Sequence, residues 1–441
     1  MQQRFEEHIN QNFGFLKNKK LLVACSGGVD SVALAHLLKK TSFSIAIAHC
    51  NFLLRGEESH ADEAFAKQLA DTLKCPFYCE QFDTHSFAKN EKVSIQMAAR
   101  ALRYQWFFEL LEANEYDFLV TAHHLDDDFE TFLINTIRTT GLRGLTGIPS
   151  YTEKIVRPLL PFTKEDIKSY ALDHDIAWRE DSSNQKTDYL RNKLRIDIVP
   201  KLKEIEPQLL QNFANTQRHL SDSHRLLDDY IGLVYRKVVT ETNDGYSISI
   251  TKLRKFPNTK ALLYELLHPF GFTAWQDVCD LLDAETGKKI ISNTHTLLKN
   301  RTELLLRKNE SVDNDKEYII LEKEKEVGRP IKLKFESLEL KKTATTSIKD
   351  KNIIFVDKKK VNYPLHVRKW RRGDVFYPYG LDGKKKVSKF FKDKKLSLFD
   401  KNNVWLLCSD SKVLWIVGYA ADRRFKITEE TTSILKITHN E

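Results

Sequence analysis

The first half of the chain alternates short apolar runs with amphipathic stretches. Four runs predict strands: LLVAC (21–25), SIAIAHC (44–50), PFYCEQF (76–82) and FLVTAH (118–123). Three stretches between them predict helices: 31–40, 58–74 and 94–113. Buried strands separated by helices are typical of a parallel sheet, so we expect an α/β fold with a doubly wound sheet. Such sheets bind ligands beyond the carboxyl ends of their strands.

Length and composition limit the class of protein. The chain has 441 residues, enough for two or three domains, and 41% of them are hydrophobic, which argues against a largely disordered chain. No apolar run is long enough to cross a bilayer, and the polar start MQQRFEEHINQNF is unlike a secretory signal. The six cysteines are scattered, as in reduced proteins. We therefore expect a cytoplasmic protein.

The strand–helix alternation ends after about residue 205. Residues 209–239 predict a long amphipathic helix, 245–307 carry no motif with a chemical interpretation, and the charged stretch 308–330 predicts a linker with one strand. A small β-rich, α+β unit is expected from about 345. We predict three domains: 1–208, a helical connector and middle domain at 209–330, and a basic C-terminal domain at 331–441. No motif determines the oligomeric state, and a homodimer is compatible with the sequence.

Positive charge is concentrated near the C-terminus. The net charge is +9, yet residues 357–395 alone contain fourteen Lys and Arg against four Asp, an excess of ten. Concentrated positive charge attracts a polyanion by releasing its counterions, which favours nucleic acid as the partner. A solvated lysine-rich surface would have the same composition, so charge alone leaves both interpretations open.

The first predicted strand leads into a glycine-containing loop and then a helix. Its residues are Ser26, Gly27, Gly28, Val29, Asp30 and Ser31. Two glycines let the backbone approach an anion closely, and the helix start offers free N–H groups. Asp30 is suited to hold Mg²⁺ or its water. The loop fits neither GxxxxGK[ST] nor GxGxxG, and the plain alternative is a tight strand–helix turn.

A second polar group follows the fourth predicted strand. Asp127 and Glu130 lie three residues apart at the start of a helix, so their carboxylates project to one side. Two acids there suit the ammonium group of an amino acid. A helix start enriched in acids for electrostatic reasons is the alternative. The adjacent His123 and His124 point in different directions, so we do not expect a zinc site.

The loop SGGVDS resembles the PP-loop of the N-type ATP pyrophosphatases, which have a Rossmann-like fold. A series of further motifs, in order, resembles the tRNA(Ile)-lysidine synthetases: HCNFLLRG (49–56), ARALRY (99–104), AHHLDDDFET (122–131), RTTGLRGL (138–145), RPLLPF (157–162), DSSN (181–184), YLRNKLR (189–195) and VRKWRRGDVFYPYGLDGKKKVSKFFKD (367–393). The sequence departs from the family pattern at Phe52, where the family has histidine, and at Thr139, where it more often has glycine.

The resemblance implies a reaction. The family uses ATP and Mg²⁺ to adenylate the C2 carbonyl oxygen of the wobble cytidine in a CAU-anticodon tRNA(Ile). The ε-amine of free L-lysine then attacks that carbon and expels AMP, giving lysidine and changing decoding from AUG to AUA. Adenylation converts a poor leaving oxygen into a good one. One group must also accept a proton from the lysine ammonium, and the sequence does not identify it.

The resemblance also implies roles for residues. Catalytic roles fall to Asp30, Asp127, Glu130 and Arg103; lysine recognition to Asp127 and Glu130; ATP binding to residues 26–31; and the metal to Asp30. Arg100 and Arg103 lie near the nucleotide, where they neutralise phosphate charge. Contacts with tRNA are expected from Asn51, Arg55, Arg191, Arg195, Arg371, Arg372, Lys384, Lys385 and Lys386. For Phe390 and Phe391 we expect a place in the core.

Two other functions are compatible with parts of the sequence. A PP-loop tRNA thiolase would share the nucleotide chemistry, but such enzymes usually need paired catalytic cysteines or an iron–sulfur CxxC set, and the chain has neither. A non-catalytic tRNA-binding factor would keep the fold without ATP turnover. The intact SGGVDS loop and the paired acids argue against it.

Overall fold

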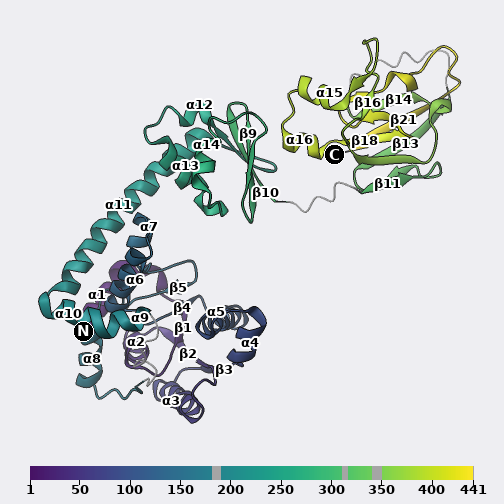
Figure 1. The fold of residues 1–441 in the computed structure, drawn as a ribbon. Helices are drawn as coiled ribbons and strands as arrows, with labels where there is room; N and C mark the ends of the chain where they lie inside the picture. Colours follow the sequence, from purple (N-terminus) through teal and green to yellow (C-terminus); the bar gives the residue numbers. More distant parts are fainter. Residues whose placement is uncertain (181–189, 310–315, 340–349, 441) are drawn as a thin grey trace. The chain divides into compact units, whose positions relative to one another are not determined.

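The computed structural model describes residues 1–180, 190–309, 316–339 and 350–440. Within these ranges the chain forms two compact units, Met1–Asp229 and Tyr230–Glu441. Figure 1 shows the ribbon and its labels. None of the described helices is both long enough and apolar enough to cross a membrane.

The first unit is built on a five-stranded parallel sheet. Its spatial order is β3-β2-β1-β4-β5, and the strands are β1 (Lys20–Ala24), β2 (Ser44–Asn51), β3 (Phe77–Gln81), β4 (Phe118–Val120) and β5 (Ile155–Val156). The four predicted strands and the parallel sheet are confirmed. The two-residue strand β5 is too short to give a periodic signal, and the sequence did not predict it.

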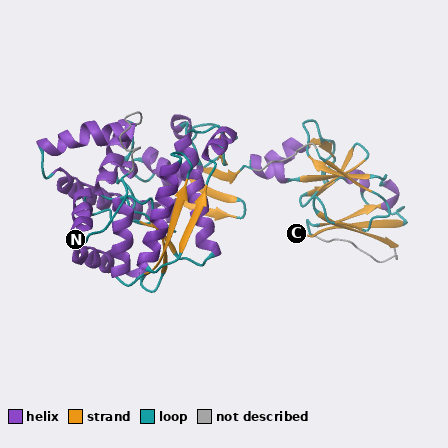
Figure 2. Cartoon of the chain, turned by 90° about the horizontal axis from the view of Figure 1, so that it is seen from below, coloured by secondary structure: helices purple, strands orange, loops and turns teal. Residues whose placement is uncertain are grey.

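Helices cover both faces of this sheet, as Figure 2 shows. The predicted helices are confirmed as α2 (Val29–Lys40), α3 (Glu57–Leu73) and α5 (Ile95–Ala113). Because successive strand residues point to opposite faces, Leu21 and Val23 pack in the cluster that includes α2 and α3, whereas Leu22 packs with Phe107 of α5. The doubly wound arrangement is confirmed.

The remaining helices of this unit surround the sheet. They are α1 (Gln2–Asn12), α4 (Thr84–Glu91), α6 (Leu125–Ile137), α7 (Leu142–Leu145), α8 (Lys164–Asp173), α9 (Leu190–Lys193), the π-helical segment η3 (Leu194–Ile198) and α10 (Val199–Ile205). The predicted long helix is α11, Leu209–Val238, within one residue of the expected end.

The first part of the second unit includes the region 245–307, in which no motif with a chemical interpretation was recognised. It forms an antiparallel sheet in the order β6-β7-β10-β9-β8 with short helices. The strands are β6 (Val239–Thr242), β7 (Gly245–Ser249), β8 (Lys289–Ile291), β9 (His295–Asn300) and β10 (Glu303–Lys308); the helices are α12 (Ile250–Leu253), α13 (Thr259–Leu267) and α14 (Trp275–Asp280).

The C-terminal part of this unit is β-rich, as predicted. Two sheets, β11-β15-β18-β19-β20 and β12-β13-β21-β14, share one core, and β16 and β17 form a small ribbon. The strands are β11 (Glu317–Ile320), β12 (Glu326–Val327), β13 (Lys332–Glu339), β14 (Ile353–Asp357), β15 (Leu365–Lys369), β16 (Val375–Phe376), β17 (Lys385–Lys386), β18 (Trp405–Ser409), β19 (Lys412–Ile416), β20 (Ala420–Ala421) and β21 (Ser433–Asn440); the helices are α15 (Val387–Asp393) and α16 (Leu398–Asn403).

One prediction for this region is wrong. The stretch 308–330 was expected to hold a single strand, and it contains two, β11 and β12. Each pairs with a later strand of the C-terminal part, β11 with β15 and β12 with β13. The partner strands lie outside the stretch, so the charged composition of the stretch itself gave no sign of a second strand. The three domain boundaries stay a prediction.

Candidate active site

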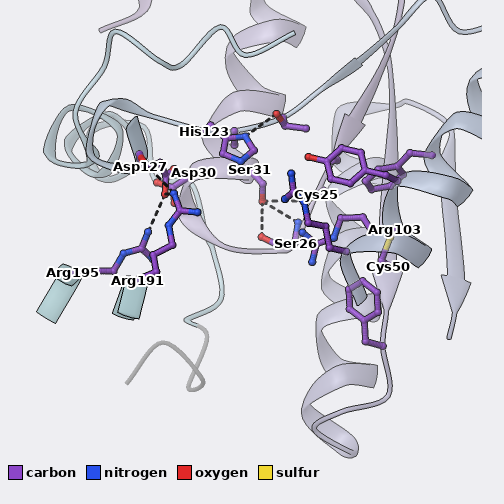
Figure 3. Close-up of a pocket in the computed structure, with 17 residues that line it drawn as sticks. Cys25, Ser26, Asp30, Ser31, Cys50, Arg103, His123, Asp127, Arg191 and Arg195 are labelled. Atoms are coloured by element: carbon purple, nitrogen blue, oxygen red, sulfur yellow. Dashed lines mark hydrogen bonds and ion pairs between the residues drawn. The ribbon is translucent and has the colours of Figure 1, made fainter. Parts of the chain in front are cut away.

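A cavity of about 430 Å³ lies at the carboxyl ends of β1, β2 and β4 (Figure 3). This is the edge where a sheet of this kind is expected to bind its ligand, because β1 lies between β2 and β4 and the chain order reverses there. The lining side chains come from these strand ends and from α2, α5, α6, α9 and η3: Ala24, Cys25, Ser26, Asp30, Ser31, Cys50, Phe52, Arg100, Arg103, Tyr104, Phe107, Thr121, Ala122, His123, Asp127, Arg191 and Arg195.

The loop between β1 and α2 has the geometry of an anion cradle. Gly27 has a φ of +88°, a conformation that favours glycine. Gly28 is the N-cap residue of α2, and because it has no side chain it leaves the first N–H groups of the helix uncovered. The Ser31 hydroxyl donates to the Gly28 carbonyl at 3.0 Å and accepts from the Ser26 N–H at 3.2 Å. The first N–H groups of α2 have no carbonyl partner within the helix, so they remain available to phosphate oxygens.

Asp30, in the first turn of α2, fits a bound cation. Its Oδ1 is buried and has no hydrogen-bond partner, and burial raises the pKa of this carboxyl. Oxygen atoms are the ligands that Mg²⁺ prefers, and protein sites often supply one or two carboxylates while substrate phosphates supply the rest. The part of the chain that the structure describes holds no cluster of three or more His, Cys, Asp or Glu suited to a metal ion. Asp30 therefore suits Mg²⁺ that arrives with a nucleotide.

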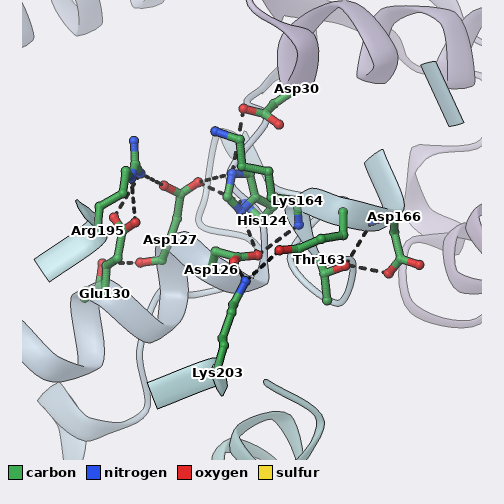
Figure 4. A network of polar contacts seen from close by, with 12 residues as sticks. Asp30, His124, Asp126, Asp127, Glu130, Thr163, Lys164, Asp166, Arg195 and Lys203 are labelled. Carbon is green, nitrogen blue, oxygen red and sulfur yellow. Dashed lines mark hydrogen bonds and ion pairs between the residues drawn. The ribbon is translucent and has the colours of Figure 1, made fainter. Parts of the chain in front are cut away.

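Two acids and two arginines form a network beside the cavity; Figure 4 labels Asp127, Glu130 and Arg195, and Figure 3 labels Arg191. Arg195 donates from Nε to Glu130 Oε1 at 2.6 Å and from Nη2 to Asp127 Oδ1 at 2.9 Å. Arg191 donates from Nε to Glu130 Oε2 at 2.9 Å. These contacts confirm that the two acids project to one side, and both arginines reach Glu130.

The two acids differ in access to the cavity. Asp127 lines it, whereas Glu130 is only 2% exposed and lies behind the arginines. Burial pushes the pKa of Asp127 up, but the nearby histidines and both arginines outweigh this and leave the pKa below its usual value. Asp127 is therefore ionised at neutral pH and faces the cavity as a carboxylate.

The two histidines separate, as expected from adjacent positions. His123 lines the cavity, with Nδ1 2.9 Å from the Thr121 hydroxyl, and burial lowers its pKa to about 4. His124 is buried, with Nε2 3.4 Å from Asp127 Oδ2 and 3.7 Å from Asp30 Oδ2. His124 thus lies between Asp30 of α2 and Asp127 of α6, and His123 presents a neutral imidazole.

The opposite wall carries positive charge. Arg100 and Arg103 line the cavity, and neither has a carboxylate partner among the described residues. Arg103 lies over the ring of Phe52, 5.2 Å from its centroid, and Phe52 stacks on Phe82. Phenylalanine at position 52 therefore supports Arg103 through its ring. These cations suit a ligand that brings negative charge.

Two residues predicted to bind tRNA lie outside the cavity lining. Asn51 is 1% exposed; its Nδ2 donates to Glu63 and its Oδ1 accepts from the Leu53 N–H. A contact between Asn51 and a base edge would require it to give up these partners. Arg55 donates to Asp62 at 2.8 Å, with 30% of its side chain exposed. The tRNA contacts of Arg191 and Arg195 also stay predictions.

The basic residues predicted near the C-terminus lie in the second unit. Arg371, Arg372, Lys384 and Lys386 are exposed, while Lys385 pairs with Asp393 at 2.7 Å. Phe390 and Phe391 are buried in a core cluster, as predicted, and so is Phe376. The exposed lysines and arginines are therefore better placed for RNA than these aromatics.

Several residues of the site were not found by sequence reasoning. Thr121, Tyr104 and Phe107 line the cavity, and Lys203 donates to Asp126 at 2.7 Å from a helix more than 70 residues away. Thr121 lies near the end of a predicted strand and Tyr104 is the last residue of the ARALRY motif, so these two positions did offer a signal. The DSSN motif (181–184) lies outside the described residues.

Family models match three parts of the chain. A PP-loop domain matches residues 1–202, a TilS substrate binding domain matches 241–309, and a TilS substrate C-terminal domain matches 365–437.

Whole-length relatives agree with these matches. A tRNA(Ile)-lysidine synthase of Parabacteroides distasonis is 41% identical over 423 residues, which is 95% of each chain. One of Bacteroides thetaiotaomicron is 36% identical over 444 residues, 99% of each. Among solved structures, a U34-tRNA thiolase of Methanococcus maripaludis aligns with a TM-score of 0.42 at 17% identity, covering 49% of this chain and 78% of that one.

Proposed function

Because the chain belongs to the tRNA(Ile)-lysidine synthase family, we propose that its cavity brings together the reacting parts of ATP, lysine and tRNA(Ile). The protein is an ATP-dependent ligase that forms lysidine on tRNA(Ile). The observation that carries the proposal is that the phosphate-binding loop, Asp127 and Arg103 all face one cavity.

The loop of residues 26–31 binds the phosphates of ATP in this proposal. The N–H groups at the start of α2 and the hydroxyl of Ser26 face the phosphate oxygens, and the helix dipole favours their charge. Asp30, whose Oδ1 lacks a hydrogen-bond partner, would hold Mg²⁺ through its carboxylate. An ion bound there would neutralise phosphate charge and make pyrophosphate a better leaving group.

Arg103 and Arg100 stabilise the charge that moves onto the departing pyrophosphate. They are suited to this role because no carboxylate among the described residues neutralises them in the absence of a ligand. The C2 oxygen of the wobble cytidine attacks the α-phosphorus, and the bond to the β-phosphate oxygen breaks. Electrostatic stabilisation of this kind is often the largest single contribution to catalysis.

Asp127 binds the ammonium group of lysine and orients it. Its lowered pKa makes it a poor proton acceptor, so we assign it to recognition and not to deprotonation. Glu130 acts through Arg191 and Arg195, which it holds against Asp127. The neutral imidazole of His123 accepts a hydrogen bond from the lysine amine as the amine approaches the activated carbon.

A sulfur-transfer function finds no support in the cysteines of the cavity. Burial raises the pKa of Cys25 and raises the pKa of Cys50 to about 12, so neither thiol is ionised at neutral pH. A nucleophilic cysteine needs the opposite shift. tRNA is the partner of the second unit, and we propose that exposed residues such as Lys384 and Arg372 contact its phosphates. A homodimer stays a prediction.

Labelled lysine tests the proposal directly. Purified protein, Mg·ATP, labelled lysine and a CAU-anticodon tRNA(Ile) transcript are incubated, and label in the RNA is counted. The control transcript has uridine in place of the wobble cytidine. We expect label in the first transcript only. ATP-dependent tRNA binding without label would contradict lysidine formation, and a sulfur-donor assay would then test the thiolase alternative.

A further inference from the structure

Arg157 is a buried cation to which the proposed function assigns no role. It is the first residue of the RPLLPF motif (157–162) and directly follows β5, at the carboxyl end of the sheet. Only 7% of the residue is exposed, and its guanidinium has no ion pair with a carboxylate among the residues that the structure describes. Burial lowers the pKa of Arg157, yet an arginine side chain stays charged at neutral pH. Because a buried charge without a counter-charge destabilises a fold, Arg157 points to a role in function.

Two contacts hold the Arg157 side chain. Nη1 donates to the Pro149 carbonyl at 2.8 Å, which anchors the guanidinium to the segment before β5. The guanidinium also donates a hydrogen bond to the Tyr104 hydroxyl. Tyr104 lines the cavity, whereas Arg157 is not among its lining residues. Arg157 therefore supports the cavity wall from behind, through the hydroxyl of a side chain that faces the ligand.

The ring of Tyr104 holds a second arginine. Arg100 lies four residues earlier on α5, on the same face of the helix, and its guanidinium is 4.8 Å from the ring centroid, within the range of a cation–π contact. Arg100 is exposed, and a long exposed side chain samples many rotamers, so the ring restricts where its charge lies. Tyr104 therefore contacts Arg157 through its hydroxyl and Arg100 through its ring.

We propose that Arg157 is a positioning residue for adenylation: through the Tyr104 hydroxyl it fixes the ring that holds Arg100, and so places Arg100 for the charge on the departing pyrophosphate. The inference rests on the proposed function, because that function assigns this charge to Arg100. Arg157 touches no reacting atom and acts through Tyr104 alone. It follows that removing the Tyr104 hydroxyl has the same effect as removing the Arg157 guanidinium, and that the two losses do not add.

Pyrophosphate release in a single turnover tests this chain of contacts. Full-length protein in excess over the tRNA(Ile) transcript is mixed with saturating Mg·ATP and no lysine, so that adenylation alone is measured. For Tyr104→Phe and for Arg157→Met we expect the rate to fall about tenfold, the effect of losing a hydrogen bond to a charged group. The double variant should lie within about twofold of the slower single variant, because both changes remove one contact. Arg100→Met should fall at least as far, and adding Tyr104→Phe to it should change the rate by less than about threefold.

Tyr78→Phe is the matched control. The Tyr78 hydroxyl also forms a hydrogen bond, to Asn114 at 3.2 Å, and Tyr78 packs in the same core cluster as Tyr104 but does not line the cavity. Its adenylation rate should stay within about twofold of that of the unchanged protein. In Tyr104→Phe the KM for lysine should not change, because lysine is assigned to Asp127; a generally damaged cavity would raise it. If Arg157→Met does not fold, the pair Tyr104→Phe and Arg100→Met decides.

Four outcomes overturn the inference: an unchanged adenylation rate in Tyr104→Phe, an equal loss in Tyr78→Phe, a raised KM for lysine in Tyr104→Phe, or losses that multiply in either double variant. The failure of the proposed function has a separate signature. If the unchanged protein releases no pyrophosphate in the presence of the transcript, the assignment of the cavity to adenylation fails. If it releases pyrophosphate while Tyr104→Phe keeps the full rate, only the positioning role of Arg157 fails.

Discussion

Asp30 shows how a single residue serves function at the expense of stability. Its buried carboxylate has one oxygen without a partner and a raised pKa, so the ionised form destabilises the fold at neutral pH. We expect Asp30→Asn to lower lysidine formation on the order of 100-fold or more, because the cation site is lost. The melting temperature should stay equal or rise, since a neutral amide removes a buried charge.

Calorimetry and the labelled-lysine assay measure both effects. Asp127→Ala should also abolish modification, but without the gain in stability, because the Asp127 carboxylate pairs with Arg195. Full activity in Asp30→Asn or Asp127→Ala would refute the role assigned to that residue.

The lowered pKa of His123 predicts that the stability of the fold depends on pH. Its pKa falls from 6.5 to about 4 on folding, so the unfolded chain takes up a proton below pH 6.5 that the folded chain refuses. Stability is therefore lost as the pH falls from 6.5 towards 4. Relative to the unchanged protein, His123→Gln should gain about 2 kcal/mol in the free energy of unfolding between about pH 7 and pH 4.5.

Urea unfolding at the two pH values measures this gain, with the exposed His85→Gln as the control. The stability of the variant must be compared with that of the unchanged protein because the pKa of Asp128 shifts in the opposite direction from that of His123. Burial raises the pKa of Asp128 to about 6, so this residue adds stability over nearly the same range as the pH falls. A gain in His85→Gln equal to that in His123→Gln would contradict the assignment.

At the scale of single residues, the sequence predicted which residues belong to the site better than it predicted which of them contact one another. The loop residues, Asp127 and Arg103 were found because each lies next to a strand end or in a motif. The pairing of Arg191 and Arg195 with Glu130 could not be predicted, because about 60 residues separate the partners and both arginines also suited RNA. Burial decides between such roles, and the sequence does not report burial.

Among the structural elements, the β1–α2 loop offers a matched pair of glycines. Gly27 has a φ of +88°, whereas Gly28 has a φ of −74°, which any residue adopts. A methyl group at either position has room, 3.6 Å from Phe65 at Gly27 and 3.5 Å from Ser26 at Gly28. We expect Gly27→Ala to weaken the binding of α,β-methylene ATP, an analogue that cannot be cleaved between the α- and β-phosphates, about tenfold. The cause is backbone strain of about 1–2 kcal/mol in the loop.

Gly28→Ala should bind the same probe within about threefold of the unchanged protein. Nucleotide titrations of both variants provide the measurement. Equal losses of nucleotide affinity in the two variants would mean that the space for a methyl group, and not the backbone conformation, determines how well the loop binds the nucleotide.

The segment after α6 contains a strained residue. Thr139 has a φ of +62°, where a β-branched residue is costly, and the family more often has glycine there. The backbone thus keeps the shape that glycine allows. Thr139→Gly should raise the free energy of unfolding by about 1 kcal/mol. Denaturant unfolding measures it, and Thr140→Gly, whose φ is not positive, should lower the same free energy.

Elements with a strong period were predictable and short ones were not. The helix 209–239 and the first four strands were found within a few residues because their apolar periodicity is long enough to recognise. Strands β5 and β12 have two residues each, and they exist because neighbouring strands supply hydrogen-bond partners. Such elements depend on tertiary contacts that no local pattern contains.

For the whole molecule, the excess of positive charge predicts that the affinity for RNA falls as the salt concentration rises. Lys384 and Lys386 are exposed, and neither forms an ion pair among the described residues. The double change Lys384→Ala and Lys386→Ala should weaken tRNA binding and reduce the slope of log Kd against log salt by about 1–2. Binding of α,β-methylene ATP should not change.

Filter binding over a salt series measures the slope. Lys401→Ala with Lys412→Ala is a control of equal charge in the same C-terminal part, outside the dense basic window. A similar loss of slope in the control would assign the effect to net charge and not to this surface.

The contacts of Arg191 and Arg195 also limit how the protein can be divided. The parallel sheet is complete at Val156, yet two side chains of the cavity wall come from almost forty residues later in the chain. A minimal fragment or a chimaera joined just after the sheet would keep the nucleotide loop and lose the arginines that hold Asp127 and Glu130. Modular exchange of nucleotide-binding folds between enzymes of this kind must therefore carry the chain through at least Arg195.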